Sequence, residues 1–277
     1  MYLRCAGPKE RRGNQPLNVE FMDSLFLFPI MKRRNFAILV VAVYAFTIAG
    51  FWISAVKTTV IFAYKDSYSW ESVPLANNGK SDNFEITSYD KPPYNMRGWV
   101  QFNISSIPSD VWIISATLRL RLWHKTTPDS TQNMGDPTGR IYGAYRLLQP
   151  WGEMTVNWVN QPNYTDTDHA TSPVPTGQGG WYGPFIWMDW DVTSIMNVWR
   201  SNSSNYGLLV RDTQENATTF YSTQFFTHDQ VPNSTYYPRL LVTYVSPLAV
   251  ASLGAVSIAE AFLIIALWRT RVRPKKH

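Results

Sequence analysis

The stretch ATLRLRLW, residues 116–123, alternates apolar and polar side chains with a period of two. One face of an extended chain would carry only leucines: Leu118, Leu120 and Leu122. The opposite face would carry Thr117, Arg119, Arg121 and Trp123. Because this alternation is typical of a half-buried β-strand, we predict a strand here with its leucines in a core and its arginines pointing away from it.

Short runs of the same kind recur along the chain and are separated by turn-rich segments, which predicts an all-β sandwich rather than βαβ units. Further strands are expected at residues 84–87, 99–104, 140–148, 186–192, 207–211, 218–222 and 240–244. Residues 193–199 are an exception, because apolar residues at helical spacing after Thr193 predict a short helix with Thr193 as its cap. Two polar stretches, residues 125–139 and 162–183, predict long loops.

Two apolar runs flank this region. Residues 36–56 contain no charged side chain, and residues 247–268 contain only Glu260. A helix of about 20 apolar residues crosses a bilayer core of about 30 Å, so we predict transmembrane helices at 35–57 and 246–268. A signal peptide cleaved after Ala55 stays open as an alternative to the first helix.

Basic residues lie on the outer side of both apolar runs, with seven in residues 1–34 and five in residues 269–276. The positive-inside rule then places both termini in the cytoplasm and the middle of the chain outside the cell. Residues 1–34 are a cytoplasmic tail or precede the true start, and residues 269–277 are a basic cytoplasmic tail. Between Lys57 and Val245 stand 13 basic and 16 acidic residues, a net charge of −3 that argues against a nucleic-acid partner.

The exported segment contains no cysteine and five glycosylation sequons. All five sequons lie between the two apolar runs and none lies in the tails, which agrees with this orientation. Glu260, inside the second run, is expected to be protonated or paired. Alanines at 251, 255 and 259 form a small-residue stripe beside it, which suggests either a homo-oligomer formed through the second helix or packing of that helix on the first one.

Four blocks resemble the DNRLRE, or disaggregatase-related, domain: RGWVQFNISSIPSDVWIISATLRLRLW (97–123), YRLLQPWGEMTVNWVNQP (145–162), WDVTSIMNVWRSNSSNYGLLVR (190–211) and PRLLVTY (238–244). The resemblance covers residues 64–245. It implies a jelly-roll-like β-sandwich of a prokaryotic surface protein, here an archaeal one, grouped with carbohydrate-binding modules of which some bind alginate. Where members of the family often carry Ser-Arg-Glu, this chain has Ser222-Thr-Gln224, so no binding residue is transferred from that block.

The strand phase predicts a ligand-binding patch on the outward face, formed by Trp99, Gln101, Arg119, Arg121 and Trp123. Aromatic faces stack on sugar rings, and guanidinium forks bind carboxylates, so the patch suits an acidic polysaccharide. Trp181 and Tyr182, between glycines, would form a mobile lip. The alternative is a solvated or loop-covered face. Four other tryptophans are expected in the core or at corners: Trp151, Trp158, Trp190 and Trp199.

Metal binding and catalysis have little support in the sequence. Asp166, Asp168 and His169 could hold Ca²⁺, but a solvated acidic loop explains them as well, and no cofactor is expected. No catalytic motif is present, and Glu153 is expected to make a structural hydrogen bond rather than to act as an acid. The chain is therefore predicted to be a membrane-anchored, non-catalytic module that binds an envelope glycan or other polysaccharide. The alternatives are a structural envelope module that contacts proteins and, third, a polysaccharide-modifying enzyme.

Overall fold

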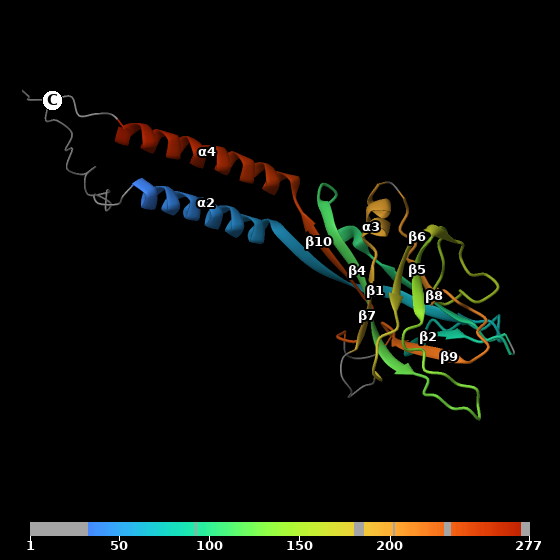
Figure 1. Cartoon of the computed structure of the whole chain (residues 1–277). Coiled ribbons are helices and arrows are strands. Elements are labelled where there is room, and N and C mark those ends of the chain that lie inside the picture. Colours follow the sequence, from blue (N-terminus) through green and yellow to red (C-terminus); the bar gives the residue numbers. More distant parts are fainter. Residues whose placement is uncertain (1–32, 92, 180–185, 202, 230–233, 273–277) are drawn as a thin grey trace, which may run out of the picture. The chain divides into compact units, whose positions relative to one another are not determined.

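A computed structural model of the 277-residue chain describes residues 33–91, 93–179, 186–201, 203–229 and 234–272. The chain divides into two compact units. One comprises Phe51–Val256 and holds all the strands (Figure 1). The described part of the other consists of residues 33–50 and 257–272.

Two long helices correspond to the apolar runs, α2 (Arg33–Ala55) and α4 (Pro247–Val272). The Thr47 hydroxyl lies 3.4 Å from Glu260 Oε2 and closer, at 2.9 Å, to the carbonyl oxygen of Val43. Within the described residues, neither of these helices nor any other combines the length and the apolar character needed to cross a membrane. The two predicted transmembrane helices are therefore not supported by the structure.

The larger unit is mostly β with a sandwich-like sheet, so the all-β part of the predicted fold class is confirmed. Its strands are β1 (Val56–Trp70), β2 (Asn83–Ser88), β3 (Met96–Phe102), β4 (Trp112–Lys125), β5 (Ile141–Leu147), β6 (Tyr164–Pro173), β7 (Trp187–Asp191), β8 (Leu208–Asp212), β9 (Tyr221–Phe226) and β10 (Arg239–Val245). Between them lie a short 3-10 helix, η1 (Ile104–Ser106), and the α-helix α3 (Thr193–Arg200).

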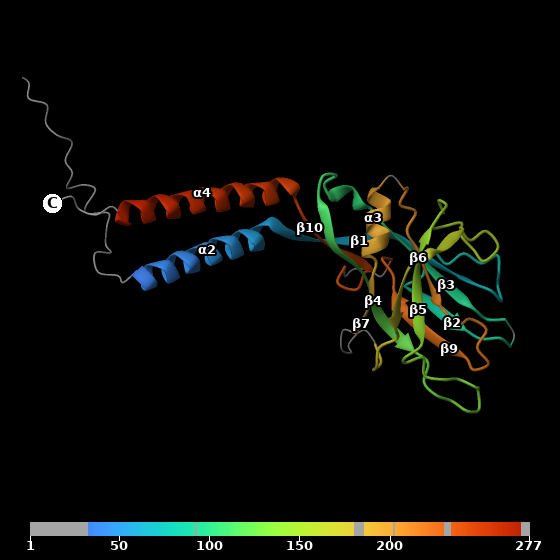
Figure 2. The ribbon, with the colours of Figure 1, turned by 45° about the horizontal axis from the view of Figure 1, so that its top comes forward.

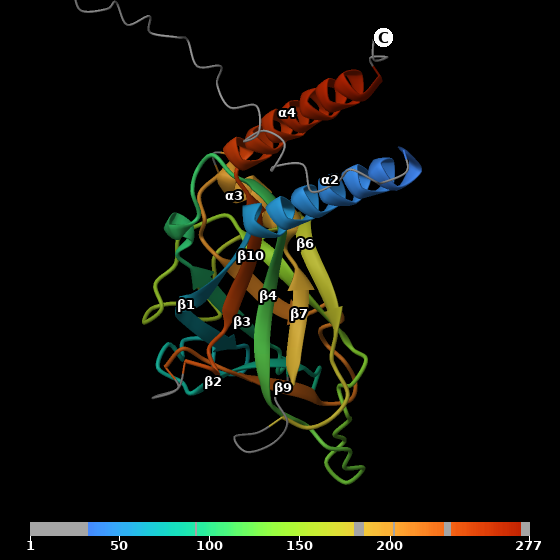
Figure 3. The ribbon, with the colours of Figure 1, turned by 90° about the vertical axis from the view of Figure 1, so that its left-hand side faces the viewer.

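Two long strands connect the layers of the sandwich. The first half of β1 pairs with β10 and its second half with β3. Likewise β4 pairs first with β10 and β7 and at its end with β9. One layer thus contains β1, β10, β4 and β7, and Figure 3 shows the last three side by side. The other contains β9, β2, β3, β8, β5 and β6 in that order, of which β9, β2 and β3 are adjacent in Figure 2.

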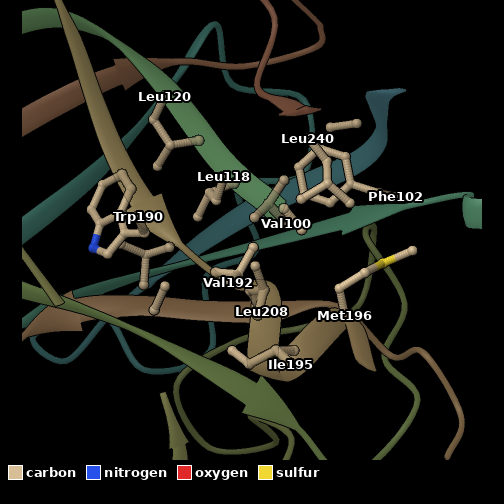
Figure 4. Packing of buried hydrophobic residues seen from close by; sticks show 14 of the residues in the cluster. Val100, Phe102, Leu118, Leu120, Trp190, Val192, Ile195, Met196, Leu208 and Leu240 are labelled. Atoms are coloured by element: carbon tan, nitrogen blue, oxygen red, sulfur yellow. The ribbon is translucent and has the colours of Figure 1, made fainter. Parts of the chain in front are cut away.

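The main core lies between the layers. A row of paired residues across β1, β10, β4 and β7 points inward and is buried: Ile61, Leu240, Leu118 and Trp190. Leu120 and Leu122 are also fully buried, so the predicted strand phase of residues 116–123 is confirmed. Ile195 and Met196 of α3 also pack into this core (Figure 4).

A second, smaller core covers the outer face of β3, β8 and β5. The paired residues Trp99, Leu209 and Tyr145 form its floor. Trp151 and Val156, from the segment between β5 and β6, cover them. The Trp151 indole N–H donates to the carbonyl of Tyr206 over 2.8 Å and so fixes this cover.

Three local predictions were wrong. Strand β6 lies inside the segment 162–183 that was expected to be a loop. It forms the end of its sheet and is largely exposed, so its sequence shows no apolar alternation. The strand expected at 218–222 begins only at Tyr221. The α3 helix exists as predicted, but Val192 occupies the N-cap position, and the Thr193 hydroxyl donates to Asp191 instead.

Candidate functional site

The predicted patch is not formed as one surface. Trp99 and Gln101 lie on β3, whereas Arg119, Arg121 and Trp123 lie on β4, and β9 and β2 stand between these strands. Trp99 is fully buried in the second core. Gln101 is 8% exposed and donates to the carbonyl of Asn205 over 2.6 Å. The alternative prediction for this face, that another part of the chain covers it, therefore holds for Trp99 and Gln101.

The other predictions about tryptophans differ in outcome. Trp151, Trp190 and Trp199 are buried as expected, while Trp158 is half-buried and lies under the guanidinium of Arg97. The predicted lip, Trp181 and Tyr182, lies outside the described residues.

Another group of arginines meets on the outer face of the β1, β10, β4 and β7 layer. One cross-strand row on this face consists of Phe62, Arg239, Arg119 and Asp189. In the next row, Arg121 is paired with Trp187. We call the set Phe62, Arg119, Arg121, Trp187, Tyr236 and Arg239 the arginine surface. Successive side chains along a strand point to opposite faces of the sheet. These outward rows therefore alternate with the inward rows that line the main core.

Arg119 makes a bidentate contact with the Asp189 carboxylate, at 2.8 Å from Nε and 2.7 Å from Nη2. Hydrogen bonding to this carboxylate raises the pKa of Arg119 above its usual range. Both side chains are more than a third exposed, so the pair adds little to stability.

Arg239 lies directly opposite Arg119 in the ladder. Its guanidinium is 4.2 Å from the ring centre of Trp187 and 5.5 Å from that of Phe62. Burial lowers the pKa of Arg239, and the charges of Arg119 and Arg121 lower it further. Three guanidinium groups thus lie close enough to repel one another.

Arg121 is only 1% exposed, contrary to the prediction of a solvent-facing side chain. Its guanidinium lies 3.9 Å from the ring centre of Tyr236 and 5.1 Å from that of Phe226. Burial lowers the pKa of Arg121, whereas hydrogen bonding to Tyr236 raises it. Trp123 stacks on Phe226 at 5.6 Å and is half-buried. Arg121 is therefore the buried member of the arginine surface, whereas Arg119 and Arg239 are more exposed to solvent.

A second polar group, not predicted as a unit, consists of Asp66, Glu153, His228 and Asp229. One ligand-type atom from each lies within 4.8 Å of the others. The predicted structural role of Glu153 is confirmed, because its Oε1 accepts the backbone N–H of Asp66 over 2.8 Å. The close contact with Asp66 raises the pKa of His228 to about 9, against burial, with help from the charges of Asp66, Asp229 and Glu153.

Sequence reasoning missed three members of this acid–histidine cluster because they come from distant segments. Asp66 lies in β1 and Glu153 between β5 and β6, while His228 and Asp229 follow β9. The adjacent pair His228 and Asp229 directly after a strand was the only local signal.

The residues considered from the sequence for Ca²⁺, Asp166, Asp168 and His169, do not form a cluster of metal-ligand atoms in the described structure. Asp168 is bound at 2.7 Å to Arg146, and His169 stacks on Tyr145 at 5.1 Å. Among the described residues, the acid–histidine cluster is the only group of three or more such ligands.

Pockets lie elsewhere on the larger unit. One of about 370 Å³ is lined by Val111, Trp112 and Arg200 among others. The Arg200 guanidinium already donates to the carbonyls of Ile107 and Pro108, so it offers little to a ligand. A polymer binds more readily along an open face than in a pocket of this size.

The sequence of the chain is similar to a known family of carbohydrate-binding modules. A model of carbohydrate-binding module family 96 matches residues 57–231, from the first strand past the end of β9 and over more than half of the chain. No curated protein shows significant similarity to it. The chain belongs to carbohydrate-binding module family 96.

Proposed function

We propose that the β-sandwich binds an acidic polysaccharide on the arginine surface. Membership of family 96 indicates carbohydrate binding by a non-catalytic module. The preference for acidic chains and the place of binding rest on the residues themselves. Two residues of the patch predicted from the sequence remain in this proposal, Arg119 and Arg121, and they are joined by Arg239 and Trp187.

The observation that carries the proposal is the pairing of Arg239 with Arg119 across the ladder. Like charges directly opposite each other destabilise a sheet. Of the paired arginines Arg119 and Arg239, only Arg119 forms an ion pair with a carboxylate of the described residues, that of Asp189. The pairing is therefore poorly explained by stability and well explained by an anionic ligand.

The surface has the two elements that a uronate polymer needs. A guanidinium fork binds a carboxylate through two parallel hydrogen bonds. Beside it, the face of a pyranose ring could stack on Trp187 or on Phe62, which is 41% exposed. The net charge of −3 over the sandwich opposes long-range attraction, so we expect modest affinity that depends on local contacts.

Replacing Arg119 and Arg239 together by Ala should weaken binding to a polyuronate such as alginate by about 10- to 100-fold, because two charge-assisted hydrogen-bonding groups are lost. The salt dependence of binding should also become flatter. Affinity electrophoresis or calorimetry at two salt concentrations measures both effects. The Lys double variant should recover only part of the affinity, since an ammonium keeps the charge but lacks the fork.

Arg146→Ala is the matched control, because Arg146 also pairs with an aspartate but lies on β5, away from this surface. It should bind as the parent does. Unchanged alginate binding by the folded double variant would refute the surface. If the parent bound no polysaccharide at all, the structural envelope module would be the better reading.

Asp189→Asn gives a test in the opposite direction. Asp189 occupies the fork of Arg119, so it competes with an incoming carboxylate. Removing its charge should strengthen binding to the polyuronate several-fold and leave binding to a neutral glucan unchanged. Weaker alginate binding by this variant would contradict the proposed role of Arg119.

We further propose that the chain is held at a cell membrane, with the sandwich outside and both termini in the cytoplasm. The support lies in the sequence: the apolar runs, the basic residues on their outer sides and the sequons between them. Protease added to intact cells should remove the sandwich and spare an epitope tag at His277. Digestion of that tag from outside, or recovery of the intact chain in the soluble fraction, would contradict this location.

A further inference from the structure

The acid–histidine cluster contains a buried carboxylate, that of Asp66, whose ion-pair partner among the described residues is a histidine rather than a Lys or Arg. Asp66 and Asp212 are both 1% exposed. Asp212 is bound by the guanidinium of Arg140 over 2.6 Å. Asp66 has no Lys or Arg in an ion pair among the described residues, and neither do Glu153 and Asp229. A buried carboxylate normally requires a cationic partner or a metal ion, and His228 is here shared by three carboxylates.

The two oxygens of Asp66 differ in their contacts. Oδ2 accepts the backbone N–H of His228 over 2.8 Å and lies 3.2 Å from His228 Nδ1. Oδ1 is buried and accepts no hydrogen bond from any described residue. Leaving a buried carboxyl oxygen without a partner is costly, so this oxygen points to a ligand that the cluster can bind.

Two more polar atoms of the same cluster lack good hydrogen bonds. Asp229 Oδ2 is also buried without a hydrogen-bond partner among the described residues, and His228 Nδ1 lacks a well-aligned hydrogen bond although it lies 3.2 Å from Asp66 Oδ2. The other three residues of the cluster are 21–30% exposed at their side chains, so a small ion can reach them from solvent. Polar atoms without good hydrogen bonds, from β1 and from the segment after β9, therefore belong to one cluster whose ligand-type atoms lie within 4.8 Å of one another.

The donor set and its spacing fit a small divalent cation. Zn²⁺ binds nitrogen and oxygen ligands at about 2.0–2.2 Å, which separates ligands in a tetrahedral shell by about 3.3–3.6 Å. His228 Nδ1 lies 3.2 Å from Asp66 Oδ2 and 3.6 Å from Glu153 Oε1. An imidazole in the set favours Zn²⁺ over Mg²⁺ or Ca²⁺, which take oxygen ligands. We propose that Asp66, Glu153, His228 and Asp229 form a Zn²⁺ site.

The site would join segments that are far apart in the sequence. Glu153 belongs to the segment that covers the second core, and Asp66 belongs to the strand shared by both layers. A cation bound only by the folded chain stabilises it by mass action. At 100 times the dissociation constant, Zn²⁺ should raise the Tm by about 5–10 °C.

The test uses the purified full chain after treatment with EDTA. Calorimetry with Zn²⁺ should show one binding site, and Zn²⁺ should raise the Tm. Ca²⁺ and Mg²⁺ serve as competitors at the same concentrations. Asp66→Asn and Glu153→Gln keep the shapes of the side chains but remove a charged ligand, and each should weaken Zn²⁺ binding by at least about 10-fold. Asp168→Asn, in the acidic segment first considered for a metal, is the matched control and should bind as the parent does.

Several results would overturn the site. One is the absence of saturable binding at a stoichiometry of one. Another is unchanged Zn²⁺ affinity in folded Asp66→Asn and Glu153→Gln. Binding of Ca²⁺ in preference to Zn²⁺ would overturn the assignment of the ion. If Asp66→Asn fails to fold, Glu153→Gln and His228→Gln give the same answer, and X-ray absorption of the Zn²⁺-loaded parent should show one imidazole and carboxylate oxygens in the shell.

Discussion

Replacing Trp99 by Ala should lower the free energy of unfolding by about 3–5 kcal/mol, the range for removing a fully buried tryptophan. Trp99 has no exposed surface and packs with Leu209, Tyr145 and Trp151 in the second core. Deleting the indole leaves a cavity that the neighbouring strands cannot close, because each is held by its ladder. Urea unfolding followed by circular dichroism measures the change.

Trp112→Ala is the matched control, since Trp112 is 57% exposed on β4 and its loss should change stability by less than about 0.5 kcal/mol. Trp99→Phe should cost less than Trp99→Ala, because the indole N–H of Trp99 has no hydrogen-bond partner among the described residues. If Trp99→Ala unfolded at the same urea concentration as the parent but lost glycan binding, the original interpretation of Trp99 as a ligand contact would be restored.

Replacing Leu120 by Ala should cost about 2–5 kcal/mol. Leu120 is fully buried in the main core and pairs with Met188 of β7. Its strand holds the two layers together, so the cavity would lie where β4 passes from β10 and β7 to β9. Thermal and urea unfolding of the module should both shift.

Leu75→Ala, the same change at a side chain that is 75% exposed, should leave the unfolding midpoint nearly unchanged. Equal effects of the two substitutions would contradict the burial of Leu120. Arg121→Ala is not a suitable control on the same strand, because Arg121 is buried under Tyr236 and its loss would remove packing as well as charge.

The alternation of residues 116–123 was enough to predict which side of β4 faces the main core. That prediction is local, because successive side chains in a strand point to opposite faces whatever the neighbouring strands are. The helix at 193–199 and the strand at 240–244 were predicted from periodicity for the same reason. Strand β6 was missed because an exposed end strand needs no apolar face.

The alternation of apolar and polar residues could not predict which segments cover the outer faces of the strands. Trp99 points away from the main core as predicted, but Trp151 and Val156 come from a segment about 50 residues later and bury it. Arg121 is likewise covered by Tyr236, more than 100 residues away. A side chain that points away from the main core is not necessarily exposed to solvent. Whether it is exposed depends on packing by segments that are distant in the sequence.

The chain by itself determined the strand phase, the all-β class, the charge distribution and the resemblance to a carbohydrate-binding family, because each depends on residues close together in sequence or on composition. The tertiary structure decided the order of strands. That order separates Trp99 from Arg119 and brings Arg239 opposite Arg119. It also brings Asp66 and His228 within 3.2 Å of each other. Such contacts depend on register and crossovers between segments as much as 162 residues apart, and no local periodicity encodes them.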